Sequence, residues 1–105
     1  MKTFEELQEA VLDWADERDL LEANPNRQFL KVVEELGELA SAMAKMQSKK
    51  EIDAMGDVLV TLIILARQID LKPVGCLEVA YNEIADRTGK TVNGVFIKDE
   101  NGSNT

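Results

Sequence analysis

Two groups of acidic residues are the part of this sequence whose residue types and spacing suit a chemical site. Glu34, Glu35 and Glu38 lie in one predicted helix, and at 100° per residue they crowd one stripe of its surface. Asp53 and Asp57 lie four positions apart in the next predicted helix and share a stripe there. Like charges at these spacings destabilise a helix unless a positive group neutralises them. Both groups are therefore candidates for binding a cation.

A solvated acidic face is the alternative interpretation, and it fits most glutamate-rich helices. Asp57 argues against it, because this residue lies beyond the first turns of its helix and borders the most apolar stretch of the chain, residues 58–66. A buried carboxylate without compensation costs several kcal/mol. We therefore expect a positive group to face Asp57.

The residue composition decides which cation such a site would take. Only the short turn at residues 47–49 joins the two acidic helices, so they are expected to pack antiparallel and bring their carboxylates together. The chain has no histidine, which leaves hard oxygen ligands, and these select Mg²⁺, or Mn²⁺ as a substitute. Carboxylate-bound Mg²⁺ typically bridges to substrate phosphates. The sequence thus predicts a magnesium site formed by Glu35, Glu38, Asp53 and Asp57.

Length, charge and residue usage exclude several other functions. The 105 residues correspond to one domain. A net charge of −8 argues against a nucleic-acid groove or an anionic membrane as partner. The absence of histidine excludes Ser-His-Asp and Cys-His catalysis, and the single cysteine, Cys76, cannot form an internal disulfide. No apolar run approaches the roughly 20 residues of a membrane span, so a cytoplasmic protein is expected.

Four helices are predicted to position these residues, at 3–21, 27–46, 49–70 and 73–87. Thr3 with Glu6 and Ser48 with Glu51 fit capping boxes at two of the helix starts. Gly89 is expected to form a left-handed cap after the fourth helix. An Asn-Gly pair between β-preferring residues predicts a hairpin or extended arm over residues 91–97, and residues 99–105 are expected to form a flexible polar tail.

The expected fold class is all-α, an antiparallel four-helix bundle-type subunit with a short extended C-terminal arm. One apolar face of the second helix is formed by Phe29, Val32, Val33, Leu36, Ala40 and Met43. The third helix is apolar on all sides over residues 58–66, which predicts burial all round. Three other helices can hardly cover it, so we predict a homo-oligomer, either a dimer or a tetramer. A compact monomeric bundle is the alternative.

The acidic residues also carry a family resemblance. The run Glu34-Glu35-Leu36-Gly37-Glu38, followed by Gly56-Asp57-Val58-Leu59, resembles the EExxE and ExxD motifs of the MazG-like, all-α nucleoside triphosphate pyrophosphohydrolases. Residues 80–90 and 92–98 are similar to short MazG-like proteins of phage and bacterial type. The resemblance covers residues 12–98, and a helical domain of this type is assigned to residues 1–98. Ala54 stands where the ExxD motif has glutamate and Asp53 lies beside it, which leaves the number of metal ions open.

The resemblance implies hydrolysis of a ribo- or deoxyribonucleoside triphosphate to the monophosphate and pyrophosphate. Water, activated by Mg²⁺ and a glutamate, would attack the α-phosphorus. The implied metal ligands are Glu35, Glu38, Asp57 and, in addition, Asp53, and the implied catalytic residues are Glu34 and Glu35. Arg87 and Lys90 are the implied phosphate contacts.

Recognition of the base and sugar is less well marked in the sequence. Trp14, the only tryptophan, could stack on a nucleobase, although an aromatic residue at helical spacing is more often part of the core. Lys31 precedes the acidic motif by about one turn and either contacts the substrate or has a plain surface role. Two other functions stay open: a non-catalytic nucleotide- or partner-binding protein, which Ala54 favours, and a structural helical dimerisation module.

Overall fold

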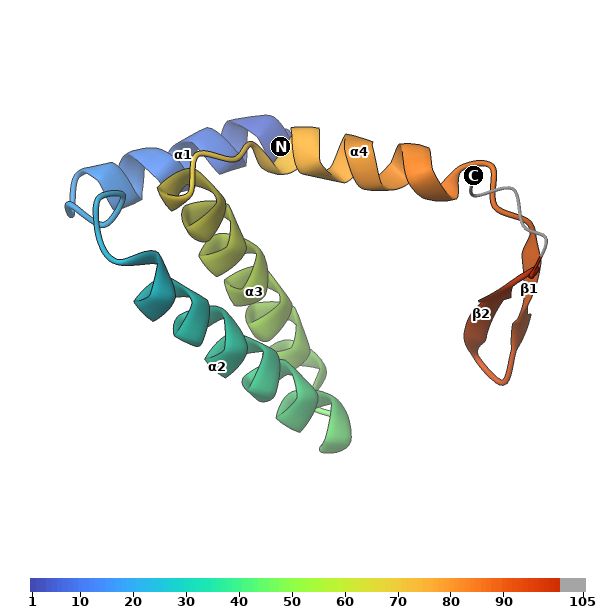
Figure 1. Cartoon of the computed structure of the whole chain (residues 1–105). Helices are drawn as coiled ribbons and strands as arrows, with labels where there is room; N and C mark the ends of the chain where they lie inside the picture. Colours follow the sequence, from blue (N-terminus) through green and yellow to red (C-terminus); the bar gives the residue numbers. More distant parts are fainter. Residues whose placement is uncertain (101–105) are drawn as a thin grey trace. The chain divides into compact units, whose positions relative to one another are not determined.

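The computed structural model describes residues 1–100, which form four helices and a two-stranded sheet (Figure 1). These elements are α1 (Phe4–Asp16), α2 (Pro25–Ala44), α3 (Ser48–Gln68), α4 (Pro73–Ile84), β1 (Gly89–Val92) and β2 (Val95–Lys98). The fold is therefore mostly helical with a short extended C-terminal arm, as the sequence predicts. Residues 101–105 of the predicted polar tail lie outside the described residues.

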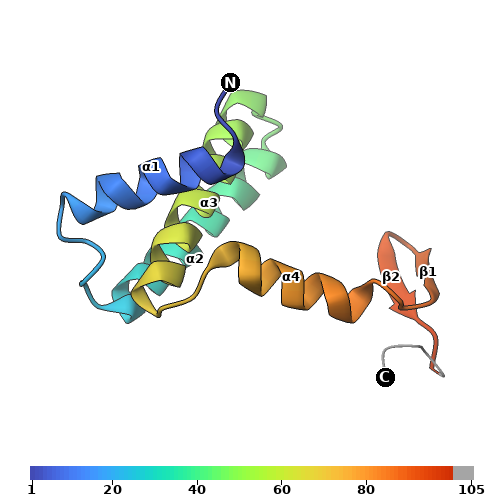
Figure 2. The same cartoon turned by 90° about the horizontal axis from the view of Figure 1, so that it is seen from above.

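The chain divides into two compact units, Met1–Leu71 and Lys72–Thr105. In the first unit α2 and α3 form an antiparallel hairpin, and α1 packs on α3 (Figures 1 and 2). The side-chain amide of Gln28 donates to the carbonyl of Thr61 at 3.1 Å, and that of Gln68 donates to the carbonyl of Leu20 at 2.8 Å. These two bonds fix the α1–α2 connection and the start of α2 against the C-terminal half of α3. The antiparallel arrangement predicted for the acidic helices is confirmed.

The helix starts follow local hydrogen bonding. Thr3 and Glu6 form the predicted capping box, with each side chain accepting from the other residue's backbone N–H. α2 begins at Pro25, two residues before its predicted start, because a proline loses no hydrogen bond in the first turn and Asn24 caps the helix. The capping box predicted at Ser48 is wrong. Ser48 is already helical, the N-cap is Gln47, and no described side chain caps this helix start.

The helix ends fall short of their predicted positions. α1 ends at Asp16 instead of residue 21, in a turn that places Asp19 at a φ of 59°, and α4 ends at Ile84 instead of residue 87. Gly89 is not a left-handed cap but the first residue of β1. A Cβ atom there would collide with the carbonyl oxygen of Ile97, so the close approach of β2 requires glycine.

The second unit contains α4 and the predicted hairpin, which is confirmed. β1 and β2 pair antiparallel with Val92 opposite Val95. The connecting Asn93 and Gly94 have φ values of 51° and 80°, as the favoured two-residue hairpin turn requires. The backbone N–H of Asp99 donates to the carbonyl of Thr88, which extends the pairing beyond the strands.

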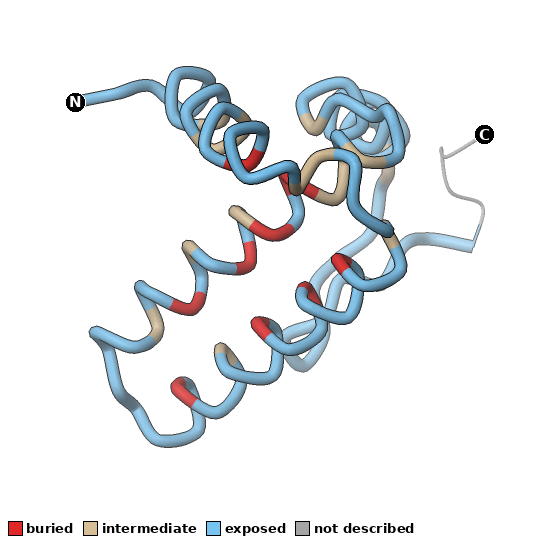
Figure 3. Tube along the Cα trace, turned by 90° about the vertical axis from the view of Figure 1, so that its left-hand side faces the viewer, coloured by how far each residue is buried: buried red, intermediate tan, exposed pale blue. Residues whose placement is uncertain are grey.

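The core of the first unit lies between the facing sides of α2 and α3 (Figure 3). On α2 the buried residues are Gln28, Val32, Glu35 and Ala42, and on α3 they are Ala54, Val58, Thr61, Ile63 and Ile64. The apolar face predicted for the second helix is therefore not the face that packs within this chain. Only Val32 of that set is buried, while Phe29 and Leu36 remain 55% and 48% exposed.

The third helix is buried on one side only. Its outer side carries large apolar residues that stay exposed in the single chain, namely Ile52, Met55, Leu59, Leu62 and Ile69. The prediction of burial all round is thus not met by one copy of the chain. Within residues 1–100, no helix combines the length and low charge that a membrane span requires.

Candidate functional site

The centre of the site is Glu35, an acidic residue inside the α2–α3 interface. Its stripe of α2 faces α3, and the residue is only 7% exposed. The Nζ atom of Lys31, one turn earlier on α2, lies 3.8 Å from Glu35 Oε1 and 3.6 Å from Glu34 Oε1. The other carboxylate oxygen, Oε2, is buried and has no hydrogen-bond partner among residues 1–100. A buried oxygen in this state calls for a donor or a cation.

The pKa of Glu35 is affected by acidic residues from both helices. Burial raises the pKa of the Glu35 carboxyl group above its ordinary value, and the negative charges of Glu38 and Asp57 raise this pKa further. Lys31 opposes the rise. Glu35 and Glu38 on α2 and Asp57 on α3 therefore lie close enough to repel one another, as expected for residues that share a cation.

The structure reverses the burial predicted for two of these acids. Asp57 is exposed, and Glu35 is the buried carboxylate. α3 turns Ala54, Val58 and Thr61 toward the interior, so the side chain of Asp57, next to Val58 in sequence, lies at the edge of the interface. Lys31 pairs with Glu34 and Glu35, and within residues 1–100 no positive group pairs with Asp57, so the group expected to face it is not found there.

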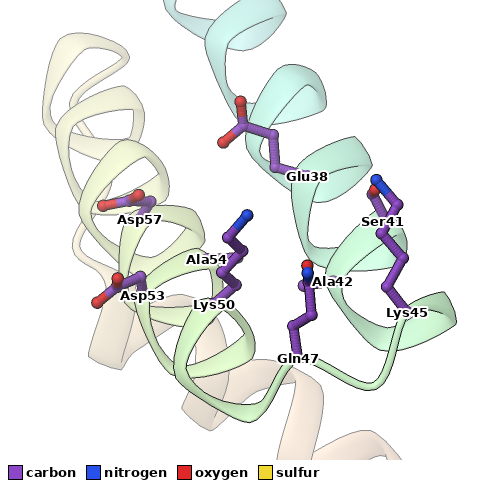
Figure 4. A pocket seen from close by; sticks show the side chains of 9 residues that line it. All are labelled: Glu38, Ser41, Ala42, Lys45, Gln47, Lys50, Asp53, Ala54 and Asp57. Atoms are coloured by element: carbon purple, nitrogen blue, oxygen red, sulfur yellow. The ribbon is translucent and has the colours of Figure 1, made fainter.

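A cavity of about 430 Å³ opens beside the acidic residues, at the end of the hairpin that carries the α2–α3 turn (Figure 4). Its lining includes Glu38 from α2 and Asp53 and Asp57 from α3. In Figure 4 the two aspartates lie one turn apart on α3, and Glu38 extends from α2 toward α3. Asp53 thus joins the acidic group by lining the same cavity. We call this the turn cavity.

A second cavity, of about 510 Å³, lies at the α1 side of the hairpin and is called here the tryptophan cavity. Glu35 and Asp57 line it together with Trp14, Lys31 and Arg27. Apolar lining comes from residues such as Leu20, Val60 and Ile64. Of the acidic residues, Asp57 lines both cavities, Glu35 lines the tryptophan cavity, and Glu38 and Asp53 line the turn cavity.

The donor atoms of these residues suit a divalent cation, but their positions do not form a metal-binding group. The donors are all carboxylate oxygens, and one of them is the unpartnered Glu35 Oε2. Within residues 1–100, however, no three acidic or cysteine side chains are gathered closely enough to bind a metal ion. The structure thus brings Glu35, Glu38 and Asp57 into electrostatic contact without closing a ligand shell around one point. Magnesium remains a prediction.

The residues predicted to bind substrate fall in both units. Trp14 is 48% exposed, and the guanidinium carbon of Arg18 lies 4.4 Å from its ring centroid, so Trp14 is not a core residue. Arg87 is half-buried, and among the described residues its Nε atom has no hydrogen-bond partner. Lys90 is exposed on β1. Arg87 and Lys90 belong to the second unit, and their predicted contacts with phosphate remain predictions.

The sequence reasoning missed two lysines. Lys45 and Lys50 line the turn cavity; in Figure 4 the side chain of Lys45 runs along α2 beside Ser41, and that of Lys50 extends from α3 between the two helices. A signal for them exists in the sequence, because Lys45 follows Glu38 by seven positions and Lys50 precedes Asp57 by seven. A spacing of seven returns to the same face of a helix after two turns.

Comparison with known proteins gives one informative match. The chain is 39% identical over 69 residues to an uncharacterized 18.2 kDa protein encoded in the rep-hol intergenic region of Haemophilus phage HP1 (strain HP1c1). The match covers 65% of this chain and 42% of that protein, so the chain spans less than half the length of this relative. No protein-family model matches the chain, and no solved structure matches it.

Proposed function

We propose that this protein is a Mg²⁺-dependent nucleotide pyrophosphohydrolase, which converts a ribo- or deoxyribonucleoside triphosphate to the monophosphate and pyrophosphate. The observation that carries the proposal is Glu35, a buried carboxylate with an unpartnered oxygen and a raised pKa, which lines the tryptophan cavity. A purely structural helix pair would gain stability from an apolar residue at this position. The resemblance of the two acidic motifs to MazG-like enzymes supports the same activity.

The metal ligands in this proposal are Glu35, Glu38 and Asp57, with Asp53 as a further ligand. When bound, Mg²⁺ neutralises phosphate charge and lowers the pKa of a coordinated water molecule, and Mn²⁺ substitutes for it. Burial, together with the repulsion by Glu38 and Asp57, raises the pKa of Glu35, and both effects are an energetic reason for this carboxylate to accept a cation.

The chain's own residues supply the proton transfer. The oxygen of a water molecule forms a bond to the α-phosphorus, the bond from that phosphorus to the α,β-bridging oxygen breaks, and pyrophosphate leaves with the bridging oxygen. The proton released by the water passes to a carboxylate. Glu35 is the first candidate, because its Oε2 atom has no hydrogen-bond partner within residues 1–100. Glu34, which is exposed and paired with Lys31, is the second.

The nucleoside of the substrate would occupy the tryptophan cavity. The exposed Trp14 ring offers a stacking surface, and the apolar side chains of Val60 and Ile64 line the same space. Lys31 lines this cavity beside the carboxylates, where it would meet the α-phosphate.

A second copy of the chain would cover the outer side of the hairpin. Exposed apolar residues recur at intervals of three, four or seven on α2 (Phe29, Val33, Leu36 and Met43) and of three and four on α3 (Ile52, Met55, Leu59 and Leu62). This spacing is the one by which helices pack against other helices, and contiguous exposed apolar surface of this kind marks an interface. The proposed enzyme is therefore a homo-oligomer, either a dimer or a tetramer.

The decisive experiment incubates the protein with each common ribo- and deoxyribonucleoside triphosphate in Mg²⁺ and identifies the products. Pyrophosphate together with a monophosphate is the expected pair. The proposal would be contradicted if no nucleoside triphosphate is hydrolysed between about pH 7 and 9, or if orthophosphate is released in place of pyrophosphate.

A non-catalytic nucleotide-binding protein is the second candidate, and Ala54 favours it. Ala54 is 5% exposed and packs in the α2–α3 interface at the position of the motif glutamate. This candidate predicts that a nucleotide with Mg²⁺ raises the midpoint of thermal unfolding but is recovered intact.

A further inference from the structure

The second unit contains many apolar side chains but has no core of its own. α4 has no buried residue, and every residue of β1 and β2 is exposed. A helix of 12 residues and a lone two-stranded hairpin are each marginally stable in water. Units of fewer than about 40 residues usually need a disulfide, a metal or a partner. Cys76 is a free thiol, and residues 1–100 contain no group of side chains that could hold a metal, so a partner surface is required.

One side of α4 carries a stripe of large apolar residues suited to such a partner. Val74, Leu77, Tyr81 and Ile84 are between 51% and 68% exposed. Their spacing of three, four and three residues places them on one face of the helix. Val79 is exposed as well, but at 100° per residue it lies on the opposite face. The stripe has the spacing by which one helix packs on others.

The helical hairpin of the first unit carries two exposed stripes with the same spacing, formed on α2 by Phe29, Val33, Leu36, Ala40 and Met43 and on α3 by Ile52, Met55, Leu59 and Leu62. Each stripe is turned by about 100° in the same sense from the buried side of its own helix. Because α2 and α3 are antiparallel, the two stripes lie side by side on one face, which we call the outer face. Two parallel rows of side chains form a groove for a third helix.

The exposed area points to a second copy of the chain as the occupant of this groove. The chain exposes 8481 Å², whereas a folded monomer of 11.7 kDa is expected to expose roughly 5,900 Å². The excess of about 2,600 Å² is at least as large as the roughly 1,000–2,500 Å² that each partner of an obligate homodimer buries.

Charge indicates which part of the second copy receives α4. Residues 1–71 contain 15 acidic and 8 basic side chains, a net charge of −7. Residues 87–98, which follow α4, contain Arg87, Lys90 and Lys98 and no acidic residue. Two second units packed together would bring these positive groups into repulsion, whereas a first unit attracts them. The complementary surface is therefore the first unit.

We propose that α4 of each copy packs on the outer face of a second copy, so that two chains exchange their second units. The stripe of α4 would lie in the groove between the stripes of α2 and α3, with the positive segment 87–98 beside the acidic first unit. The inference specifies the homo-oligomer of the proposed function and uses none of its chemistry.

The first test is sedimentation of the full chain over a range of concentrations. Leu77→Glu should raise the dissociation constant of the oligomer at least about 100-fold, because its charge would be buried without a partner. Val79→Glu, the matched control, adds the same charge on the opposite face of α4 and should stay within about threefold of the wild type. Circular dichroism confirms that both variants keep their helices.

A mixture of two defective chains then identifies the surfaces that meet. Leu77→Glu alters only the second unit, and Leu36→Glu alters only the outer face of the first, so each variant alone should be a monomer. In a mixed pair both substitutions fall in one docking site and the other site is intact. An equal mixture should therefore recover the oligomer at concentrations where neither variant forms it.

Several results would overturn the exchange. An oligomer of wild-type stability in Leu77→Glu, or equal losses in both α4 variants, would remove α4 from the interface. A mixture that stays monomeric would mean that α4 pairs with a second α4 or that the hairpins pair with each other. A wild type that is monomeric at all concentrations, with a lower midpoint of thermal unfolding in Leu77→Glu, would place α4 on its own chain. Nucleotide hydrolysis is measured separately, so each of these results leaves the proposed activity standing.

Discussion

Glu35 lies at a position where folding and chemistry make opposite demands on one side chain. Its carboxylate is buried between two helices, beside the acids of Glu38 and Asp57, and one of its oxygens has no partner among the described residues. A leucine or methionine there would remove the desolvation penalty and fill the interface. Retention of an acid at such a place is typical of a functional site.

Replacement of Glu35 by glutamine should separate these two demands. In the absence of metal, Glu35→Gln should raise the midpoint of thermal unfolding, because the repulsion by Glu38 and Asp57 is relieved. The stabilisation conferred by Mg²⁺ should disappear, and kcat should fall by at least about 100-fold if Glu35 accepts the proton. The control is Glu9→Gln, which removes an exposed charge on α1 outside both cavities. Equal stabilisation of the wild type and Glu35→Gln by Mg²⁺ would contradict the metal site.

The pH dependence of stability provides an independent measurement on the same residue. Because the pKa of Glu35 is raised in the folded chain, the folded state binds the proton more tightly than the unfolded state. The resulting stabilisation is complete below the ordinary glutamate pKa and is lost as the pH rises through the raised value. In EDTA, the unfolding free energy of the wild type should therefore fall relative to that of Glu35→Gln as the pH rises above about 4.3. Urea unfolding of both proteins across this range gives the difference, and parallel curves would mean that Glu35 has an ordinary pKa.

At the scale of the elements, the sequence predicted the existence and order of the helices better than the direction in which they face. Periodicity, the Thr3 capping box and the Asn-Gly turn correspond to real elements. The inner face of α2 was not predictable, because its stripe contains Gln28 and Glu35 and is less apolar than the outer stripe through Phe29 and Leu36. When a helix has two stripes that can both be buried, periodicity alone does not show which one packs within the chain.

In the candidate site, too, the sequence predicted features that depend on local spacing but not those that depend on packing between helices. The spacing predicted that Glu35, Glu38, Asp53 and Asp57 would converge. Glu38 and Asp57 do raise the pKa of Glu35, but within residues 1–100 no three of these acids gather closely enough to hold a metal ion. Which of them is buried depends on the rotation of each helix about its own axis, and this is set by packing. The cavity lysines Lys45 and Lys50 were missed for the same reason, because surface lysines on acidic helices are ordinary until a cavity is seen between them.

The tryptophan cavity is formed by α1, α2 and α3 together, so ligand binding there has a direct optical readout. Trp14 is the only tryptophan, and it lines this cavity but not the turn cavity. Addition of a nucleoside triphosphate with Mg²⁺ should quench its fluorescence, whereas inorganic pyrophosphate should leave it unchanged. Trp14→Ala should weaken nucleotide binding by about 1–3 kcal/mol through loss of stacking. Quenching by pyrophosphate alone would show that the tryptophan cavity also binds a ligand without a nucleoside.

At the scale of the whole molecule, the proposed oligomer rests on the outer stripes of the hairpin. Exposed apolar residues recur along both helices, with Leu36 and Leu59 near the middle of each. Burial of such residues is the main favourable term in association between identical chains. A charge placed in the middle of this surface should therefore disrupt the assembly.

Leu36→Glu should shift the protein from an oligomer toward a monomer, as measured by sedimentation or light scattering. Leu36→Met, which keeps a similar apolar volume, should leave the assembly intact. A wild type that sediments as a monomer at all concentrations would contradict the oligomer. A Leu36→Glu protein with the wild-type mass would instead place the interface elsewhere.

Asp57 lines both cavities, so whatever occupies one of them changes the surroundings of a carboxylate that the other shares. Under the proposed function, two ligands held in the two cavities would therefore not bind independently, and each would change the affinity for the other by the same factor.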